Sequence, residues 1–310
     1  MICTSLQHKN FEQILAILED PAVEMAEVRL DRCDLTDDQI EELFSESDTP
    51  LIATCRIDGC PSPEEAERRL RLAIEAGARF ADLEIEAPAQ MSKHFQQLCR
   101  KHGTEIIRSF HDFEGTPDME VLQMALARCF RYGADIAKVV TTCHTAEDAA
   151  RVESLYSLVL EGVDSLQGRL VAFGMGDAGR DTRLQCLRRG APFTFAALSA
   201  EEATAPGQWP LAELYAALYG DRKPYRAEGR RMPASKSFAQ RAILAAALAE
   251  GTSHLGGYSP CGDSEAALAL ARALFACGDS DGLARRTLEA YARDPRGVLS
   301  LHAKTLLSAR

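Results

Sequence analysis

The chain has 310 residues, of which 46% are hydrophobic and 26% are charged, so it is long enough to bury a large core and its composition is ordinary for a globular protein. Its net charge of -11 argues against general nucleic-acid binding, and no apolar run approaches the roughly 18 residues that a membrane span needs. The first ten residues, MICTSLQHKN, have neither the basic flank nor the apolar run of a signal peptide, so we expect a cytoplasmic protein.

Residues 1–220 contain eight short apolar runs, and each predicts a buried strand. The runs cover residues 2–6, 26–31, 51–56, 80–86, 105–112, 136–142, 170–176 and 193–198. Helical periodicity separates most of them. Residues 62–78, for example, begin with Ser62 as the expected N-cap, Pro63 in the first helical position and Glu65 three residues after the cap.

This alternation predicts an α/β fold, a (β/α)8 TIM barrel over residues 1–220. An open doubly wound sheet is the structural alternative. Such a sheet would normally bring a glycine-rich phosphate turn after its first strand, and the stretch ICTSLQHKN contains no glycine.

Charged and polar residues interrupt the apolar runs, most of them near the ends where the active site of a barrel is built. They are Glu27, Arg29, Arg56, Asp82, Glu84, Glu86, His111, Asp112, Lys138 and, after the seventh run, Arg183. Glu27 and Arg29 are two residues apart and therefore share one face of their strand. Inside a closed barrel, isolated charges would be costly unless they serve one another or a ligand.

Lys138 lies within an apolar run, where its charged form is disfavoured and its amine is freed to attack a carbonyl carbon. This is the chemistry of a Schiff-base enzyme. The alternative is a lysine on the outer face of the sheet that extends to solvent. His111, at the end of the preceding run, favours the first interpretation because imine formation and proton abstraction need a group that exchanges protons near neutral pH.

Four motifs resemble those of the type I 3-dehydroquinate dehydratases, in the same order and at the same spacing. They are EVRLD at 27–31, SFHDF at 109–113, GADIAKVVTT at 133–142 and ATAPGQ at 203–208. The resemblance covers about residues 1–220. It implies a lyase of the shikimate pathway, which supplies aromatic amino acids by way of chorismate. This enzyme would convert 3-dehydroquinate to 3-dehydroshikimate through an imine, without a metal or another cofactor.

The resemblance also implies a role for each matched position. Lys138 would form the imine, His111 would be the general acid and base, and Glu27 would be the carboxylate beside the histidine that holds and tunes it. The other matched residues would bind the substrate: Arg29, Arg56, Arg183, Thr204 and Gln208. Of these, Arg183 would grip the substrate carboxylate, a task suited to a guanidinium.

One loop departs from the family pattern, and two acidic residues have less direct roles. The loop after Arg56 is shorter than in some members of the family, so the resemblance does not decide whether a loop carboxylate contacts the substrate. Asp82 and Glu84 are expected to support His111 and Lys138 structurally rather than to act directly in catalysis.

The cysteines and histidines do not have the spacing of metal ligands. Ten cysteines are scattered singly without a C-x-x-C pair, and the seven histidines form no H-x-x-x-H pair. We expect reduced thiols, no metal and no dissociable cofactor. The expected partner is the small-molecule substrate, with neither nucleic acid nor membrane, and a homodimer is left open.

Residues 221–310 differ from the rest of the chain because they are net basic, whereas residues 1–220 are strongly acidic. Residues 219–233 have the composition of a linker, and about 231–267 resemble the start of 5-enolpyruvylshikimate-3-phosphate synthase. The matching residues Lys236, Ser237 and Arg241 would bind an anion at a helix N-terminus, although a capped helix with solvated charges is the alternative. The segment is too short for that synthase, so we predict a truncated, mainly helical appendage.

Two other functions are compatible with parts of the sequence. A class I barrel aldolase acting on a phosphorylated substrate could place the phosphate on the glycines of residues 173–181. A non-enzymatic shikimate-pathway binding module could use the basic tail. Arg183 and the 203–208 motif argue against the aldolase, and the pairing of Lys138 with His111 argues against a protein without catalysis.

Overall fold

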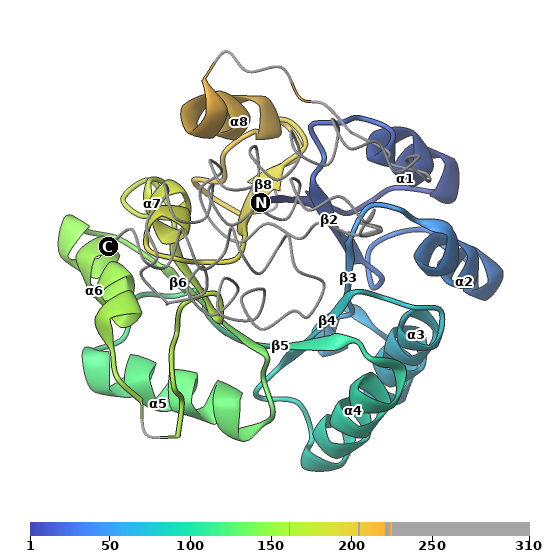
Figure 1. The fold of residues 1–310 in the computed structure, drawn as a ribbon, viewed down its shortest axis with the longest axis horizontal. Coiled ribbons are helices and arrows are strands. Elements are labelled where there is room, and N and C mark those ends of the chain that lie inside the picture. Colours follow the sequence, from blue (N-terminus) through green and yellow to red (C-terminus); the bar gives the residue numbers. More distant parts are fainter. Residues whose placement is uncertain (161, 204, 221–223, 225–310) are drawn as a thin grey trace, which may run out of the picture. The chain divides into compact units, whose positions relative to one another are not determined.

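The computed structural model describes residues 1–160, 162–203, 205–220 and 224. Eight parallel strands form one sheet in the order β7-β6-β5-β4-β3-β2-β1-β8, which curls into a barrel (Figure 1). The strands are β1 (Ile2–Leu6), β2 (Met25–Arg29), β3 (Leu51–Thr54), β4 (Phe80–Glu84), β5 (Glu105–Asp112), β6 (Ile136–Thr142), β7 (Leu170–Met175) and β8 (Thr194–Ala197). Since β7 and β8 stand at the two ends of this hydrogen-bonded order, the barrel is nearly closed. The predicted TIM barrel is confirmed.

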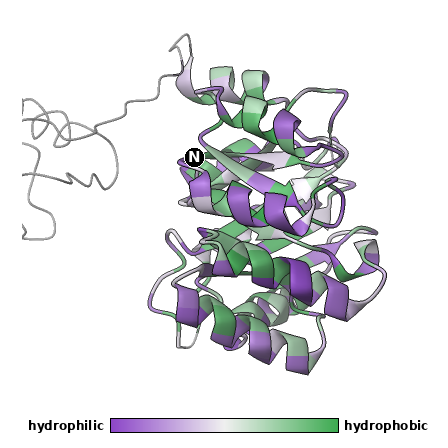
Figure 2. Ribbon diagram, turned by 90° about the vertical axis from the view of Figure 1, so that its right-hand side faces the viewer, coloured by the Kyte–Doolittle hydropathy of each residue, from purple (hydrophilic) through white to green (hydrophobic). Residues whose placement is uncertain are grey.

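Eight α-helices surround the strands (Figure 1). They are α1 (Phe11–Leu18), α2 (Asp37–Glu46), α3 (Pro63–Glu75), α4 (Ala89–His102), α5 (Met119–Arg131), α6 (Ala146–Ser154), α7 (Thr182–Arg188) and α8 (Leu211–Tyr219). A short 3-10 helix, Ile57–Gly59, follows β3, and another, Leu155–Ser157, follows α6. Hydrophobic and hydrophilic positions alternate around the helices (Figure 2), as in helices that bury one face against a sheet.

The predicted helix after Ser62 begins as the sequence indicates. The Ser62 side chain accepts a hydrogen bond from the Glu65 backbone N–H at 3.3 Å, and Pro63 occupies the first turn. The Glu65 carboxylate pairs with Arg68 in the same helix at 2.8 Å. The apolar stripe of this helix buries Leu70 and its neighbours against the barrel.

The strand bounds differ from the predicted runs mainly at their ends. Strands β1, β5 and β6 have the predicted bounds, whereas β2 ends at Arg29 and β3 ends at Thr54. The chain turns directly after β2, where the Arg32 N–H donates to the Arg29 carbonyl at 2.9 Å. Arg56 therefore lies in the loop after its strand, at the start of the 3-10 helix.

The strand register sets polar residues side by side inside the barrel. It pairs Ser5 with Glu27 and Ser109 with Lys138. The N-terminal part of the interior is filled by an apolar cluster that includes Ile52 and Phe193. The polar residues therefore lie toward the C-terminal ends of the strands, where loops can reach them.

Part of the sequence-based interpretation lies outside the described residues. This holds for Thr204, for the synthase-like stretch at about 231–267 with Lys236, Ser237 and Arg241, and for the expected helical appendage. In the part of the chain that the structure describes, no helix is long and apolar enough to cross a membrane.

Candidate active site

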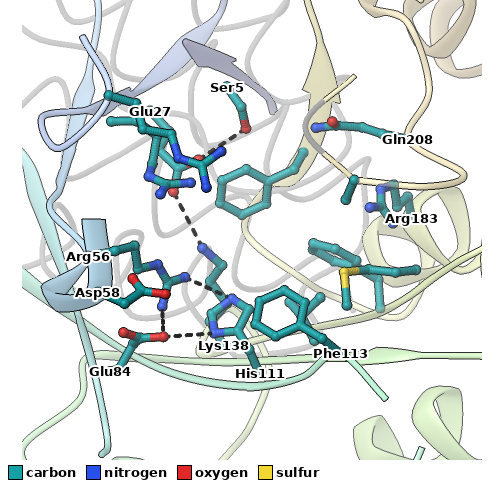
Figure 3. A pocket seen from close by; sticks show the side chains of 17 residues that line it. Ser5, Glu27, Arg56, Asp58, Glu84, His111, Phe113, Lys138, Arg183 and Gln208 are labelled. Atoms are coloured by element: carbon teal, nitrogen blue, oxygen red, sulfur yellow. Dashed lines mark hydrogen bonds and ion pairs between the residues drawn. The ribbon is translucent and has the colours of Figure 1, made fainter. Parts of the chain in front are cut away.

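A pocket opens at the C-terminal ends of the strands (Figure 3), and most of the predicted site residues line it. The predicted residues that it brings together are Glu27, Arg29, Arg56, His111, Lys138, Arg183 and Gln208. They come from three strands (β2, β5 and β6), from the loops after β3 and β8, and from the start of α7, so the closure of the barrel assembles residues that are far apart in the sequence.

Lys138 points into this pocket from β6 and is almost completely buried. Its Nζ lies 2.9 Å from Asp82 Oδ2 and 3.5 Å from Glu27 Oε1. The ring centroid of Phe195 is 4.4 Å from the same nitrogen. The outward-facing alternative is therefore wrong. Two carboxylates, Asp82 and Glu27, compensate the charge of this buried ammonium group.

The two carboxylates are held by hydroxyl groups on adjacent strands. Glu27 accepts from Ser5 Oγ and Thr54 Oγ1, both at 3.0 Å, and Asp82 accepts from Ser109 Oγ at 2.6 Å. Burial opposes the charge of Asp82, but Lys138, Arg56 and the hydrogen bond from Ser109 outweigh it and lower its pKa. Asp82 is thus an ionised partner that fixes the lysine amine, as the predicted supporting role requires.

His111 lies on β5 beside Arg56, whose Nη2 is 2.9 Å from the ring nitrogen Nε2. Phe113 stacks on the imidazole with ring centroids 5.8 Å apart and 13° between the planes. Burial, together with the nearby cations Arg56, Lys138 and Arg29, lowers the pKa of His111 well below its ordinary value. The imidazole is therefore neutral at neutral pH and is available as a base.

The carboxylate nearest to this histidine is Glu84, not Glu27 as the sequence analysis expected. Glu84 Oε1 is 3.9 Å from His111 Nδ1, whereas Glu27 contacts Lys138, Ser5 and Thr54. The strand order explains the difference. Strand β4, which carries Glu84, pairs with β5, whereas β3 and β4 separate β2 from β5.

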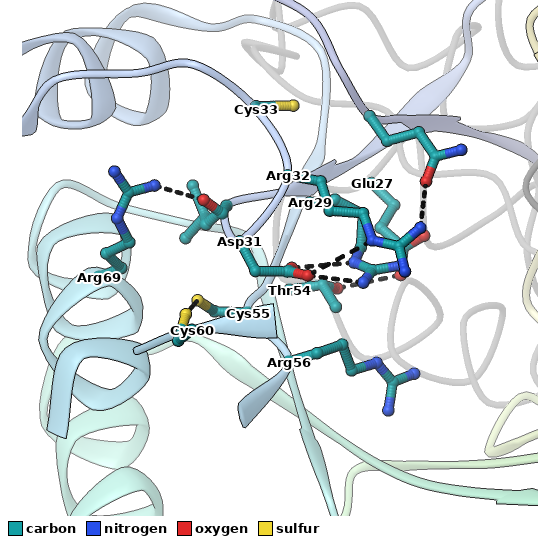
Figure 4. A network of polar contacts seen from close by, with 12 residues as sticks. Glu27, Arg29, Asp31, Arg32, Cys33, Thr54, Cys55, Arg56, Cys60 and Arg69 are labelled. Carbon is teal, nitrogen blue, oxygen red and sulfur yellow. Dashed lines mark hydrogen bonds and ion pairs between the residues drawn. The ribbon is translucent and has the colours of Figure 1, made fainter. Parts of the chain in front are cut away.

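Arg29 is fixed by a carboxylate that the sequence analysis did not single out (Figure 4). Asp31 accepts from Arg29 Nε at 3.0 Å and from Nη2 at 2.7 Å. Burial would raise the pKa of Asp31, but the hydrogen bonds and charge of Arg29 lower it below its ordinary value. A side chain at Gly59 would collide with the Asp31 carboxylate, so glycine allows the loop after β3 to close over this ion pair.

Arg183, at the start of α7, is fully buried beside the pocket. Its Nη1 donates to the Gly174 carbonyl at 2.6 Å, and its guanidinium lies 4.4 Å from the Phe173 ring centroid. Burial lowers its pKa to about 10. Among the described residues no carboxylate acts on its charge, and its Nε has no hydrogen-bond partner. An anionic substrate would supply the missing charge.

Gln208 is buried at the pocket wall, in the loop that follows β8. Gly207 has φ 71°, and a side chain there would collide with the Gly176 carbonyl. The Gly176 N–H also donates to the Pro206 carbonyl at 2.9 Å. Gly176 therefore contacts the last loop and holds it against the end of β7. This contact weakens the aldolase alternative, in which the glycines of residues 173–181 would bind a phosphate.

Several pocket residues are not predicted by the sequence patterns. Arg32, Asp58 and Phe113 line the pocket from loops, and no strand periodicity predicts them. Val140, by contrast, follows Lys138 by two residues, so alternation along β6 could have identified it. Within the described ranges, no group of three or more His, Cys, Asp or Glu residues is placed to hold a metal ion.

The geometry joins a buried amine, a neutral imidazole and an uncompensated guanidinium in one pocket. A ketone with a carboxylate could bind there, condense with the amine and lose a proton to the imidazole. Asp82, Glu27 and Asp31 hold the cationic residues in place.

Comparison with known proteins points to one family. A family model for type I 3-dehydroquinase matches residues 2–223. A 3-dehydroquinate dehydratase from Syntrophobacter fumaroxidans is 31% identical over 229 residues, which cover 70% of this chain and 95% of that protein. One from Desulfotalea psychrophila is 33% identical over 219 residues, covering 69% and 94%. The crystal structure of 3-dehydroquinate dehydratase from Geobacillus kaustophilus has a TM-score of 0.60 and 24% identity, with coverage of 71% and 92%.

Proposed function

The chain belongs to the type I 3-dehydroquinase family and catalyses the dehydration of 3-dehydroquinate, and we propose that it does so through an imine on Lys138. It is therefore a hydro-lyase of the shikimate pathway. The observation that most strongly supports the imine is the burial of Lys138 in a pocket that also contains the neutral base His111.

Substrate binding would begin with the carboxylate of 3-dehydroquinate at Arg183. This guanidinium is buried, and no carboxylate among the described residues compensates its charge, so a bound anion would supply the stabilisation that water gives an exposed arginine. Arg29 and Arg56 would bind other polar groups of the substrate, and Gln208 would contact it from the last loop. Thr204 belongs to the same motif and is proposed to add its hydroxyl.

The imine would form at the substrate ketone. Neutral His111 takes a proton from the Lys138 ammonium, and the freed amine attacks the carbonyl carbon, while a proton moves from nitrogen to oxygen to make a neutral carbinolamine. His111 then returns its proton to the carbinolamine hydroxyl, water leaves, and a protonated imine remains. Asp82 and Glu27 lie within 3.5 Å of Nζ and would stabilise this cation, since the nitrogen keeps its positive charge.

The elimination would follow on the imine. The protonated imine withdraws electrons from the adjacent C–H bond, and His111 takes that proton to give an enamine. The enamine electrons then expel the hydroxyl group, which leaves as water with a proton from His111. Hydrolysis of the imine releases 3-dehydroshikimate and restores Lys138. We propose, as expected from the sequence, that no cofactor takes part.

Replacing Arg183 by alanine is expected to weaken substrate binding more than it slows the chemical steps. Removing one partner of a buried charge pair commonly costs about 2–5 kcal/mol, which would appear as a higher KM in steady-state kinetics. Arg183→Lys, which keeps the charge but loses the planar fork, should fall between alanine and the wild type. Arg188→Ala changes an exposed arginine on the same helix and should leave KM unchanged. An unaltered KM in Arg183→Ala would remove this residue from carboxylate binding.

Deleting residues 226–310 is expected to leave the dehydratase reaction largely intact. We propose that residues 1–220 are the catalytic unit, which is supported by the family match to residues 2–223 and by a barrel that is nearly closed within that range. The measurement compares kcat and KM of the truncated and full chains. An insoluble or inactive truncation would show that the tail is required. Lys236, Ser237 and Arg241 stay predicted anion-binding residues.

We propose a cytoplasmic location. The described residues contain eight cysteines, and all of them are free thiols, including the neighbours Cys55 and Cys60. Free thiols in this number fit a reducing compartment.

A further inference from the structure

Arg56 lies between Glu84 and His111 and contacts both (Figure 3). Its Nη1 forms an ion pair with Glu84 Oε1, and its Nη2 is 2.9 Å from His111 Nε2. A guanidinium can only donate hydrogen bonds, so Nε2 must be the acceptor. A neutral imidazole that accepts at Nε2 carries its proton on Nδ1. The contact with Arg56 therefore determines the tautomer of the histidine.

The other ring nitrogen faces the same carboxylate. His111 Nδ1 is buried, has no hydrogen-bond partner within the described part of the chain, and lies 3.9 Å from Glu84 Oε1. The other charged groups that act on this ring are cations: Arg56, Lys138 and Arg29. Burial raises the pKa of Glu84, and so does repulsion from Asp82. Attraction to Arg56 lowers it but is outweighed, so the net shift is upward. A more basic carboxylate is a better acceptor for the Nδ1 proton.

The backbone that carries Glu84 is anchored from behind the sheet. Arg108 Nη2 donates to the Glu84 carbonyl and to Ser92 Oγ, both at 3.0 Å. Arg128 Nη2 donates to the Ile85 carbonyl at 2.9 Å. These contacts fix the end of β4, so the position of the Glu84 carboxylate depends on its own side chain rather than on a mobile loop.

We propose that Glu84 is a positioning residue, which holds Arg56 against Nε2 and faces Nδ1–H, and so keeps His111 in the Nδ1–H tautomer in the free enzyme. The consequence for turnover rests on the proposed function. Nε2 then has the lone pair that can take the substrate proton, and Arg56 must leave it when the substrate binds. Arg56 would transfer its hydrogen bond to the substrate at that moment, which links substrate binding to exposure of the base.

The test is ¹⁵N NMR of the full chain with labelled histidine, at neutral pH and without substrate. The His111 signal is assigned by its loss in His111→Gln. The wild type is expected to show a protonated Nδ1 and an unprotonated Nε2. Glu84→Gln removes the charge that holds Arg56, so the population should shift toward the Nε2–H tautomer. Glu86→Gln, a change of an exposed carboxylate two residues away, should match the wild type.

Turnover provides the second measurement. Glu84→Gln should lower kcat about 10- to 100-fold, the range expected when a hydrogen bond to a charged group is lost, with a smaller change in KM. An Nε2–H tautomer in the wild type, or an unchanged His111 signal in Glu84→Gln, would overturn the positioning role even if the dehydratase is fully active. A Glu84-dependent tautomer in a wild-type protein without dehydratase turnover would support the positioning role and contradict the proposed function.

Discussion

Replacing Lys138 by arginine is expected to abolish the dehydration of 3-dehydroquinate while the barrel stays folded. Arginine keeps a cation beside Asp82 and Glu27, but a guanidinium stays protonated and cannot condense with a ketone. Without an imine, no other described group in the pocket offers an electron sink for the elimination. The assay follows the conjugated product by its ultraviolet absorbance.

Lys138→Ala should be equally inactive, but it tests the fold as well as the chemistry. It leaves two buried carboxylates without their cation, and breaking a buried ion pair in this way typically costs about 3–5 kcal/mol of stability. Chemical denaturation of both variants separates the two effects. Lys93→Ala, a change of an exposed lysine on α4, is the matched control and should keep wild-type turnover. Measurable turnover by a folded Lys138→Arg protein would exclude the imine.

Replacing His111 by alanine is expected to lower kcat by roughly 10²–10⁴-fold, the usual contribution of general acid–base catalysis. The loss could be larger because His111 is proposed to serve several steps. The amine of Lys138 remains, so slow imine formation should persist and borohydride should still trap it. His94→Ala, which removes an exposed histidine on α4, should have no effect on kcat. If His111→Ala loses borohydride trapping and turnover to the same extent, His111 is already needed for the condensation of the Lys138 amine with the ketone.

The pH profile of the wild type gives a second test of His111. Burial and the neighbouring cations lower its pKa below the ordinary value of about 6.5. The base is therefore still unprotonated at pH 6.5, and kcat/KM should fall only at lower pH, as the pH passes through the lowered pKa. An acid limb at or above pH 6.5 that disappears in His111→Ala would contradict the electrostatics described for the free enzyme.

Much of the barrel could be predicted because its buried strands are uniform apolar runs. Strands β5 and β6 have the predicted bounds, and Lys138 and His111 stand out because they interrupt those runs. Parallel strands place their C-terminal ends at one edge, so residues at those ends could be expected to meet. The same reasoning does not give the ends of β2 and β3, where local turns stop the ladder.

Pairings across the barrel could not be predicted from the same patterns. Glu27 and Lys138 are 111 positions apart, and their contact depends on the closure of the sheet. The assignment of Glu27 to His111 came from the family resemblance and failed because the contacts of each carboxylate depend on side-chain geometry inside the barrel, where Glu84 faces His111 and Glu27 faces Lys138. Asp31 was missed for another reason. It belongs to the EVRLD motif, but its function of fixing Arg29 follows from a buried side-chain geometry that strand periodicity does not encode.

The central claim, an imine between the substrate and Lys138, is tested most directly by borohydride trapping. Borohydride added to the wild-type protein during turnover reduces the imine to a stable secondary amine. Proteolysis and peptide mass mapping then locate the adduct. We predict a single modified site at Lys138, dependent on 3-dehydroquinate and absent from Lys138→Arg. An adduct on another lysine, or inactivation without any adduct, would contradict the mechanism.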